Sequence, residues 1–444
     1  MPLKVSISGV RGTPDALTKA VIEDFAKAYA TYLGQGKIVI GSDTRPNSDE
    51  IKNYVINALV DLGIDCIDTG ITPTPTIGVY VREKKLAGGI MITASHNPLP
   101  WNGIKLMRND GIFLNETQAK KLIEIFESKK FKKSGKLGNA TKTSNAIDIH
   151  IDKILSVIDS KPIQAKKYKV VVDPGNGASY VAAPRLLKKL GCEVISIHDD
   201  PAKVFERPPE PTPKALQKLC EKVKATKAAV GFAIDPDADR LSLVDNTGTP
   251  LSEELSIVLA TDCMLGRNPQ NKNVVTNLST TMALDDIVKK HGGQVLRTKI
   301  GEVHVSEKMK ELGSEIGGEG NGGVIYPKVG FNRDSLVGMA IILSYMAQSN
   351  KKLSSLAESV PKYYSIKDKI EVSNNDDAQA LIEKTKKLFK NKKQDLTDGV
   401  KVIFPDEWLH VRASNTEPIV RIYGEGKDLK QITDLCNQIK NYEG

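Results

Sequence analysis

Gly88-Gly89-Ile90-Met91-Ile92 is a short apolar run, and Thr93-Ala94-Ser95-His96-Asn97-Pro98 follows it directly. An apolar run of this length that is bounded by turn residues predicts a strand buried on both faces. The polar segment, which ends in proline, predicts a break in the chain that turns the hydroxyl of Ser95 outward. This strand and its loop indicate an α/β fold with a functional loop at the end of a strand.

The same α/β pattern begins three times along the chain. It restarts at Lys169-Val170-Val171-Val172 and again after Asp239, so we expect three similar units. The predicted helices cover 21–33, 50–62, a segment ending at 190, 253–264 and 282–291. The predicted strands cover 37–40, 88–92, 169–172, 193–197, 274–275 and a segment near 295.

The pattern changes after about residue 363. Alternating runs over 366–372, 400–404, 408–411 and 419–423 surround a helical segment over 378–389. This predicts a small α+β domain with an antiparallel sheet. The expected domains are therefore 1–150, 151–250, 251–365 and 366–444.

The overall composition narrows the functional classes. Of 444 residues, 40% are hydrophobic and 26% charged, which is typical of a globular protein. The net charge of +9 is spread over many predicted helix faces and only 5% of residues are aromatic, which argues against nucleic-acid binding. The positive net charge is also compatible with an electrostatic field that attracts anionic substrates to the protein. Five scattered cysteines and the lack of any membrane-length apolar run indicate a cytoplasmic protein without a membrane partner.

Asp235-Pro236-Asp237-Ala238-Asp239-Arg240 is a candidate metal site. Alternate carboxylates on one side of an extended loop repel one another unless a hard divalent cation such as Mg²⁺ binds them. An EF-hand is disfavoured because its sixth and twelfth positions hold Arg240 and Asn246. A solvated acidic turn is the alternative, but Arg240 is well placed to neutralise a bound phosphate.

Ser95 and His96 allow more than one interpretation. Ser95 is either a nucleophile or a turn residue, and the Gly-x-Ser-x-Gly elbow of hydrolases is absent. His96 is either a proton carrier or a local hydrogen-bonding residue.

A glycine-rich segment, Gly317-Gly318-Glu319-Gly320-Asn321-Gly322-Gly323, contains a literal Gly-x-Gly-x-x-Gly. A strand-like run follows it instead of a helix, so a dinucleotide site is disfavoured. Glu319 and Asn321 are suited to recognising hydroxyl groups, and a plain tight turn is the alternative.

Arg412-Ala413-Ser414-Asn415-Thr416-Glu417-Pro418 lies between two predicted strands. An arginine, two hydroxyls, an amide and free backbone N–H groups are the components of an anion site. A polar hairpin loop is the alternative. No Walker motif is present, so a nucleoside triphosphate is not indicated.

In their order along the chain, these four segments resemble those of the α-D-phosphohexomutases. The segments at Ser95, Asp235, Glu319 and Arg412 resemble the family's phosphoserine, metal, sugar and phosphate loops. Three further stretches also resemble family loops: Ser8-Gly9-Val10-Arg11-Gly12, Asn102-Gly103-Ile104-Lys105 and Thr298-Lys299-Ile300-Gly301.

The resemblance implies a heart-shaped enzyme of four domains, three similar α/β domains and a C-terminal α+β domain, around a central cleft. It implies that Ser95 is phosphorylated and shares one Mg²⁺ with Asp235, Asp237 and Asp239. It also implies a hexose 1,6-bisphosphate as intermediate and activator, and a monomer or homodimer acting on a phosphosugar. The implied catalytic residues are Ser95, Arg11, Lys105, Arg240 and His96. The implied substrate-binding residues are Lys299, Glu319, Asn321, Arg412, Ser414, Asn415 and Thr416.

One departure concerns the sugar. Many bacterial members carry Gly-Glu-x-Ser-Gly-His where this chain has Gly318-Glu319-Gly320-Asn321-Gly322-Gly323, without the Ser and the His. The resemblance favours a phosphoglucosamine mutase, with a bifunctional phosphoglucomutase/phosphomannomutase as the alternative. A phosphatase with Asp235 as nucleophile and a noncatalytic phosphosugar-binding protein are the rival classes.

Overall fold

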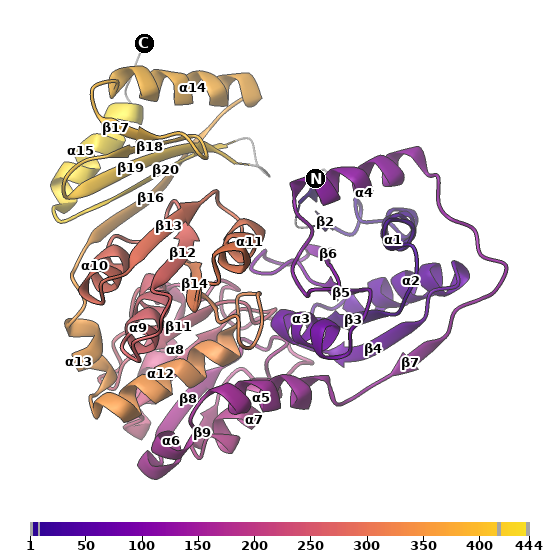
Figure 1. The fold of residues 1–444 in the computed structure, drawn as a ribbon, viewed down its shortest axis with the longest axis horizontal. Coiled ribbons are helices and arrows are strands. Elements are labelled where there is room, and N and C mark those ends of the chain that lie inside the picture. The colour runs from indigo at the N-terminus through magenta and orange to yellow at the C-terminus, as the bar shows by residue number, and fades with distance from the viewer. Residues whose placement is uncertain (1–2, 8, 415–418, 441–444) are drawn as a thin grey trace.

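The computed structural model describes residues 3–7, 9–414 and 419–440. These residues form four sheets, each from a different stretch of the chain. In Figure 1 the first unit lies on the right and the fourth at the upper left, with the second and third below the fourth.

The first sheet has the strand order β1-β2-β6-β5-β3-β4-β7. Its central strand β3 (Ile38–Ser42) is parallel to β5 (Gly88–Ile92) and β4 (Cys66–Ile71). Side chains alternate along β3, so Ile38 and Ile40 pack with α1, α2 and α4 whereas Val39 packs with α3. The buried strand predicted over 88–92 is confirmed. The other elements are β1 (Lys4–Ser6), β2 (Gly9–Gly12), β6 (Asn102–Met107), β7 (Ala140–Lys142), α1 (Lys19–Leu33), α2 (Ser48–Asp61), α3 (Thr74–Glu83) and α4 (Glu116–Ser128).

The three α/β units share one strand order. The second sheet is β11-β10-β8-β9, the third is β15-β14-β12-β13, and the first contains the matching set β6-β5-β3-β4. In each set three strands are parallel, and the strand that comes last in the chain is antiparallel to its neighbour in the set. The prediction of three similar α/β units is therefore confirmed. The strands are β8 (Lys169–Asp173), β9 (Glu193–Ser196), β10 (Val230–Ile234), β11 (Leu241–Val244), β12 (Asn273–Asn277), β13 (Gln294–Thr298), β14 (Ile316–Glu319) and β15 (Gly323–Ile325).

The second and third units share a hydrophobic core. Helices α9 (Glu254–Leu265) and α12 (Ser335–Ser349) contribute to one cluster with Phe232 of β10 and Val274 of β12. Both helices are apolar on nearly all faces because both units pack against them. The remaining helices here are α5 (Ala146–Val157), α6 (Lys161–Lys166), α7 (Ala182–Lys189), the 3₁₀ turn η1 (Pro213–Ala215), α8 (Gln217–Thr226), α10 (Ala283–Lys290), α11 (Glu302–Leu312) and α13 (Leu353–Glu358).

The fourth unit is an antiparallel sheet of order β16-β20-β19-β18-β17, as predicted. Two helices, α14 (Asn375–Leu388) and α15 (Leu429–Lys440), contribute to its core. Its strands are β16 (Tyr364–Glu371), β17 (Lys393–Asp395), β18 (Val400–Ile403), β19 (Glu407–Ala413) and β20 (Ile419–Gly426).

The boundaries near residues 150, 250 and 365 stand as our proposal for the domains. The sheets span 4–142, 169–244, 273–325 and 364–426, and β16 begins just before the last boundary. Among the described residues, no helix combines the length and the apolar character needed to cross a bilayer.

Candidate active site

Three of the predicted site loops occupy the same position in the three α/β units. Each connects the third parallel strand to the antiparallel strand: the Ser95 loop joins β5 to β6, the Asp235 loop joins β10 to β11, and residues 320–322 join β14 to β15. The shared strand order therefore brings a hydroxyl, a group of carboxylates and a glycine-rich turn to equivalent positions.

Ser95 lies in a constrained turn. Its φ of +53° is in the left-handed region, and the residue is only 2% exposed. Its N–H donates to Oγ1 of Thr93 at 2.8 Å, and its Oγ lies 3.4 Å from Nδ1 of His96. The hydroxyl is thus more enclosed than the sequence suggested, and its backbone is fixed.

Arg45 supports this turn, and sequence reasoning missed it. Its guanidinium donates to the carbonyl oxygens of Ser95 (2.6 Å), Asn97 (2.7 Å) and Trp101 (2.6 Å). The carboxylate of Asp43 holds Nε of Arg45 at 3.0 Å. No motif marks Asp43 and Arg45, which lie about 50 residues before the loop.

The three aspartates form a buried group with one open oxygen each. Asp235, Asp237 and Asp239 are all 0% exposed, and each offers a ligand atom within 4.8 Å of the others. Within the described part of the chain, Oδ2 of Asp235, Oδ1 of Asp237 and Oδ1 of Asp239 have no hydrogen-bond partner. Three hard oxygen ligands without donors fit a divalent cation such as Mg²⁺.

The backbone geometry differs from the extended loop that we expected. Ala238 has φ +64°, and its N–H donates to the carbonyl of Asp235, so the loop is a tight turn. Oδ1 of Asp235 accepts the N–H groups of Asp239 and Arg240 at 3.0 Å each. The carboxylates converge because the chain curls around Asp235.

Lys105 neutralises part of this charge. Its Nζ lies 2.6 Å from Oδ2 of Asp237 and 3.4 Å from Oδ2 of Asp239. Burial alone would lower its pKa, but the two carboxylates outweigh it and raise the pKa. Burial, with Asp239 and Asp237 as further causes, holds the pKa of Asp235 well above its ordinary value. Burial and mutual repulsion thus make Asp235 the carboxylate of this group that is hardest to ionise without a bound cation.

Arg240, His96 and Arg11 meet beside Ser95. Nη2 of Arg240 donates to Nδ1 of His96 at 2.9 Å, and Nη1 of Arg240 pairs with Glu210. The charge of Arg240, with burial, holds the pKa of His96 well below its ordinary value, so the imidazole is neutral. Nη1 of Arg11 donates to Oδ1 of Asn97 at 2.9 Å.

Glu319 and Asn321 lie in the β14–β15 hairpin. The carboxylate of Glu319 accepts from Asn277 (2.8 Å), from the N–H of Gly301 (3.2 Å) and from Arg333 (2.6 Å). Oδ1 of Asn321 is buried and without a hydrogen-bond partner among the described atoms. The predicted strand after this loop is confirmed as β15.

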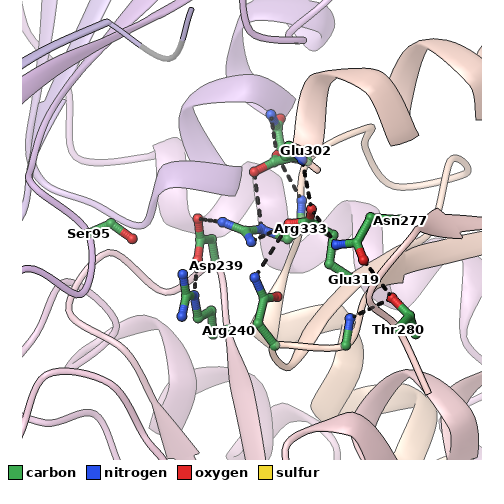
Figure 2. Close-up of polar contacts among 12 residues, drawn as sticks. Ser95, Asp239, Arg240, Asn277, Thr280, Glu302, Glu319 and Arg333 are labelled. Atoms are coloured by element: carbon green, nitrogen blue, oxygen red, sulfur yellow. Dashed lines mark hydrogen bonds and ion pairs between the residues drawn. The ribbon is translucent and has the colours of Figure 1, made fainter. Parts of the chain in front are cut away.

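Arg333 is a second residue that the sequence analysis missed. Its guanidinium pairs with Asp239 at 2.5 Å, with Glu319 at 2.6 Å and with Glu302 at 3.2 Å, as Figure 2 shows. It therefore joins the metal loop to the sugar loop. Its only sequence signal is a lone Arg in Phe331-Asn332-Arg333-Asp334.

The predicted anion site in the fourth unit is described only in part. Arg412 is 8% exposed and Ser414 lies beside it, whereas Asn415 and Thr416 fall outside the described residues. Arg421, which the sequence analysis did not select, lies on the same wall. Nζ of Lys299 is half exposed and lies 3.4 Å from Glu116 at the edge of the site.

One cavity of about 510 Å³ brings these groups together. All four units contribute to its wall. Among the described site residues, Lys299, Ser95 and the three aspartates are not part of that wall, but His96, Lys105 and Arg333 on the wall contact Ser95 or the aspartates. The site residues on the wall are Arg11, His96, Lys105, Arg240, Glu302, Glu319, Asn321, Arg333, Arg412, Ser414 and Arg421.

Four units surround one cationic cavity, and its wall residues Lys105 and Arg333 contact the buried aspartates. This arrangement defines a multidomain α/β protein with a candidate metal-dependent site for an anionic ligand. The chain belongs to the phosphoglucomutase/phosphomannomutase family of α-D-phosphohexomutases. The family's alpha/beta/alpha domains I, II and III match residues 3–133, 148–248 and 252–364, and its C-terminal domain matches residues 369–441. The resemblance stated from the sequence and the expected four-domain fold are confirmed.

Individual relatives cover nearly the whole chain. A "Phosphoglucomutase/phosphomannomutase" of Thermococcus kodakarensis is 38% identical over 94% of this chain and 93% of its own. A "Probable phosphoglucosamine mutase" of Pyrococcus abyssi is 36% identical over 97% of this chain and 95% of its own. The crystal structure of a phosphoglucomutase/phosphomannomutase family protein from Burkholderia thailandensis superposes with a TM-score of 0.85, at 26% identity, covering 98% of this chain and 97% of that one.

Proposed function

We propose that this protein is a phosphohexomutase that interconverts hexose 1-phosphate and hexose 6-phosphate through a phosphoserine at Ser95. The observation that carries the proposal is the pairing of a fixed serine with three buried aspartates at equivalent turns of neighbouring units. A reversible phosphoryl carrier needs both groups in one cavity. The names of the relatives support the same activity class.

Ser95, Asp235, Asp237 and Asp239 would hold one Mg²⁺. The three open oxygens supply carboxylate ligands, and the Ser95 side chain would add an oxygen. When bound, the ion would neutralise charge on the phosphoryl group and align it.

The transfer exchanges two P–O bonds. The bond from phosphorus to Oγ of Ser95 breaks as a bond forms to a sugar hydroxyl oxygen, and the hydroxyl proton leaves. The product is a 1,6-bisphosphate, which returns its other phosphate to Ser95 after it reorients. Arg11, Arg240 and Lys105 stabilise the charge that moves during transfer.

Proton transfer is assigned to His96 in preference to Lys105. Two carboxylates keep Lys105 protonated, so it cannot take a proton from the sugar hydroxyl. His96 is neutral and its Nδ1 lies 3.4 Å from the Ser95 hydroxyl. A neutral imidazole is able to accept a proton, but Arg240 lowers the basicity of this one and donates to the same Nδ1 at 2.9 Å, so His96 takes the proton only if that contact breaks.

The far wall holds the phosphate that does not react. Arg412 and Ser414 form the proposed clamp, and Lys299 steers the anion at the edge. Asn415 and Thr416, predicted for the same role, lie outside the described residues. Glu319 and Asn321 bind sugar hydroxyls that both orientations share.

The sugar that we favour is glucosamine phosphate, with glucose and mannose phosphates as the alternative. The Pyrococcus relative is named for the first and the Thermococcus relative for the second. The two relatives have similar sequence identities to this chain, so identity does not decide between the sugars. The choice rests on the sugar loop, which lacks the Ser and the His.

The rival functions leave features of the site unused. In a phosphatase with Asp235 as nucleophile, the fixed Ser95 turn and the far anion wall would have no role. Oδ1 of Asp235 also already accepts two backbone N–H groups. A noncatalytic binding protein would not need the carboxylate group.

A coupled assay with glucosamine, glucose and mannose phosphates tests the proposal, with Mg²⁺ and a hexose 1,6-bisphosphate present. We expect mutase turnover with glucosamine phosphate as the best substrate, and its loss in Ser95→Ala. Turnover of none of the three by the wild-type protein would refute the function. Intact-mass measurement after acid treatment separates phosphoserine, which survives, from an aspartyl phosphate, which hydrolyses.

A further inference from the structure

Gly323 has no room for a side chain, and Arg333 is the reason. A Cβ atom at Gly323 would lie 2.1 Å from Cδ of Arg333 and 2.8 Å from its Cγ. These separations are far inside van der Waals contact. The aliphatic stem of Arg333 therefore fills the space that a side chain at position 323 would enter.

The guanidinium of Arg333 contacts carboxylates from three separate segments. Nη2 contacts Asp239 of the metal loop at 2.5 Å, Nη1 contacts Glu319 of the sugar loop at 2.6 Å, and Nε lies 3.2 Å from Glu302 of α11 (Figure 2). Arg333 is only 7% exposed, so these pairs lie in a largely water-free environment. A planar guanidinium addresses three acceptors at once, which a lysine ammonium does less well.

The backbone at Arg333 is fixed on buried supports. Its N–H donates to Oε1 of Glu302 at 3.0 Å. The next residue, Asp334, caps α12 through the N–H groups of Leu336 and Val337 and pairs with buried His150 at 2.8 Å. Ser335 then donates to the carbonyl of Ala238 at 2.9 Å. Arg333 is thus held relative to both α5 and the metal loop.

We propose that Arg333 is a positioning residue for the sugar loop, and that the glycine at position 323 is needed to admit its side chain. Arg333 holds Glu319 in the orientation that binds sugar hydroxyls and ties the sugar loop to Asp239. The sugar-binding part of this inference rests on the proposed function. The packing of Gly323 against Arg333 is independent of that function.

The packing is tested by a double-mutant cycle on thermal stability in the full chain. Gly323→His should lower Tm sharply, and Arg333→Ala should lower it because three buried carboxylates lose a partner. In the double variant Gly323→His/Arg333→Ala, the loss of Tm should be smaller than the sum of the losses in the two single variants, because the imidazole then has room. Gly330→His is the control, since a Cβ there meets only an ordinary contact at 3.4 Å. Additive effects, or an equal loss of Tm in Gly330→His, would overturn the pairing.

The positioning role is tested by steady-state kinetics. Arg333→Gln should raise KM for the hexose phosphate about tenfold, more than it lowers kcat, and Arg333→Lys should restore part of the loss. Because Arg333 acts through Glu319, adding Glu319→Gln to Arg333→Gln should cost less than about twofold further. Arg82→Gln is the control, because Arg82 donates to the carbonyl of Val329 in the same loop and pairs with no carboxylate in the described part of the chain.

These measurements separate the two proposals. If Arg333→Gln and Glu319→Gln multiply in their effects, or if KM does not change, Arg333 is not a positioning residue. A wild-type protein without mutase activity would refute the proposed function instead. The stability cycle would then still decide whether Gly323 and Arg333 are a matched pair.

Discussion

Nη2 of Arg45 donates to the carbonyl oxygen of Ser95 at 2.6 Å, across 50 residues of sequence. The same guanidinium donates to the carbonyls of Asn97 and Trp101, and its Nε donates to the carboxylate of Asp43. Arg45 thus determines where the Ser95 turn lies, although it is not on the cavity wall formed by the described residues.

Arg45→Lys should therefore impair catalysis without removing charge. A lysine ammonium cannot reach three carbonyl oxygens from one planar group, so we expect kcat to fall about tenfold or more, equivalent to about 1.4 kcal/mol. The coupled mutase assay gives kcat, and intact mass gives the phosphorylated fraction. Arg185→Lys is the control because Arg185 forms a half-exposed pair with Asp148. Unchanged kcat in Arg45→Lys would contradict the supporting role.

Ser95→Gly and Ser95→Ala should both be inactive but differ in stability. A residue with a Cβ pays about 1 kcal/mol for the left-handed conformation at φ +53°, and glycine does not. We expect Ser95→Gly to unfold at higher urea concentration than Ser95→Ala. Both should lose the mass increment of one phosphoryl group. If the phosphoryl group persists in either variant, Ser95 is not its carrier.

Asp235→Asn should stabilise the metal-free protein and abolish its response to Mg²⁺. Without the ion, buried carboxylates repel one another, and an amide removes one charge while its oxygen can still accept the N–H groups of Asp239 and Arg240. Mg²⁺ at 100 times its Kd should stabilise the wild type by about 2.7 kcal/mol. Differential scanning fluorimetry in EDTA and in Mg²⁺ measures both effects. Asp49→Asn, at an exposed position, is the control, and an equal Mg²⁺ response in Asp235→Asn would exclude this site.

The pH dependence of stability should report on Glu254, which joins the third and fourth units. Burial raises its pKa to about 7, against 4.5 for a free side chain, although Lys367 at 3.4 Å opposes the shift and Glu425 and Glu253 add to it. The folded state binds the proton more tightly. The stability that protonation supplies is therefore complete below about pH 4.5 and is lost as the pH rises through about 7.

Glu254→Gln imitates the protonated form at every pH. Relative to the wild type, it should gain up to about 3 kcal/mol of stability between pH 4.5 and pH 8. Urea unfolding at the two pH values measures this difference. A constant difference between the two proteins would show that Glu254 ionises normally.

Sequence reasoning identified the elements that local pattern determines. The buried strand at 88–92 and the antiparallel sheet after residue 363 follow from the alternation and clustering of apolar residues. The buried aspartates were found because three carboxylates at alternate positions are rare without a cation. Their convergence through a turn at Ala238 was missed, since a left-handed alanine leaves no sequence signal.

Arg45 and Arg333 were missed for a different reason. Each acts on a loop far away in sequence, Arg45 on Ser95 and Arg333 on Asp239, 94 residues before it. Neither lies in a recognisable motif, and a single arginine in a loop is usually on the surface. Only the tertiary structure shows that they are buried against carbonyl and carboxylate groups.

The shared strand order has an evolutionary consequence. Because the hydroxyl, the carboxylate group and the glycine hairpin occupy the same turn of three copies of one scaffold, each loop can accumulate changes without altering the sheet that carries it. Arg333 limits that freedom, because a residue larger than glycine fits at position 323 only if the arginine side chain is also lost.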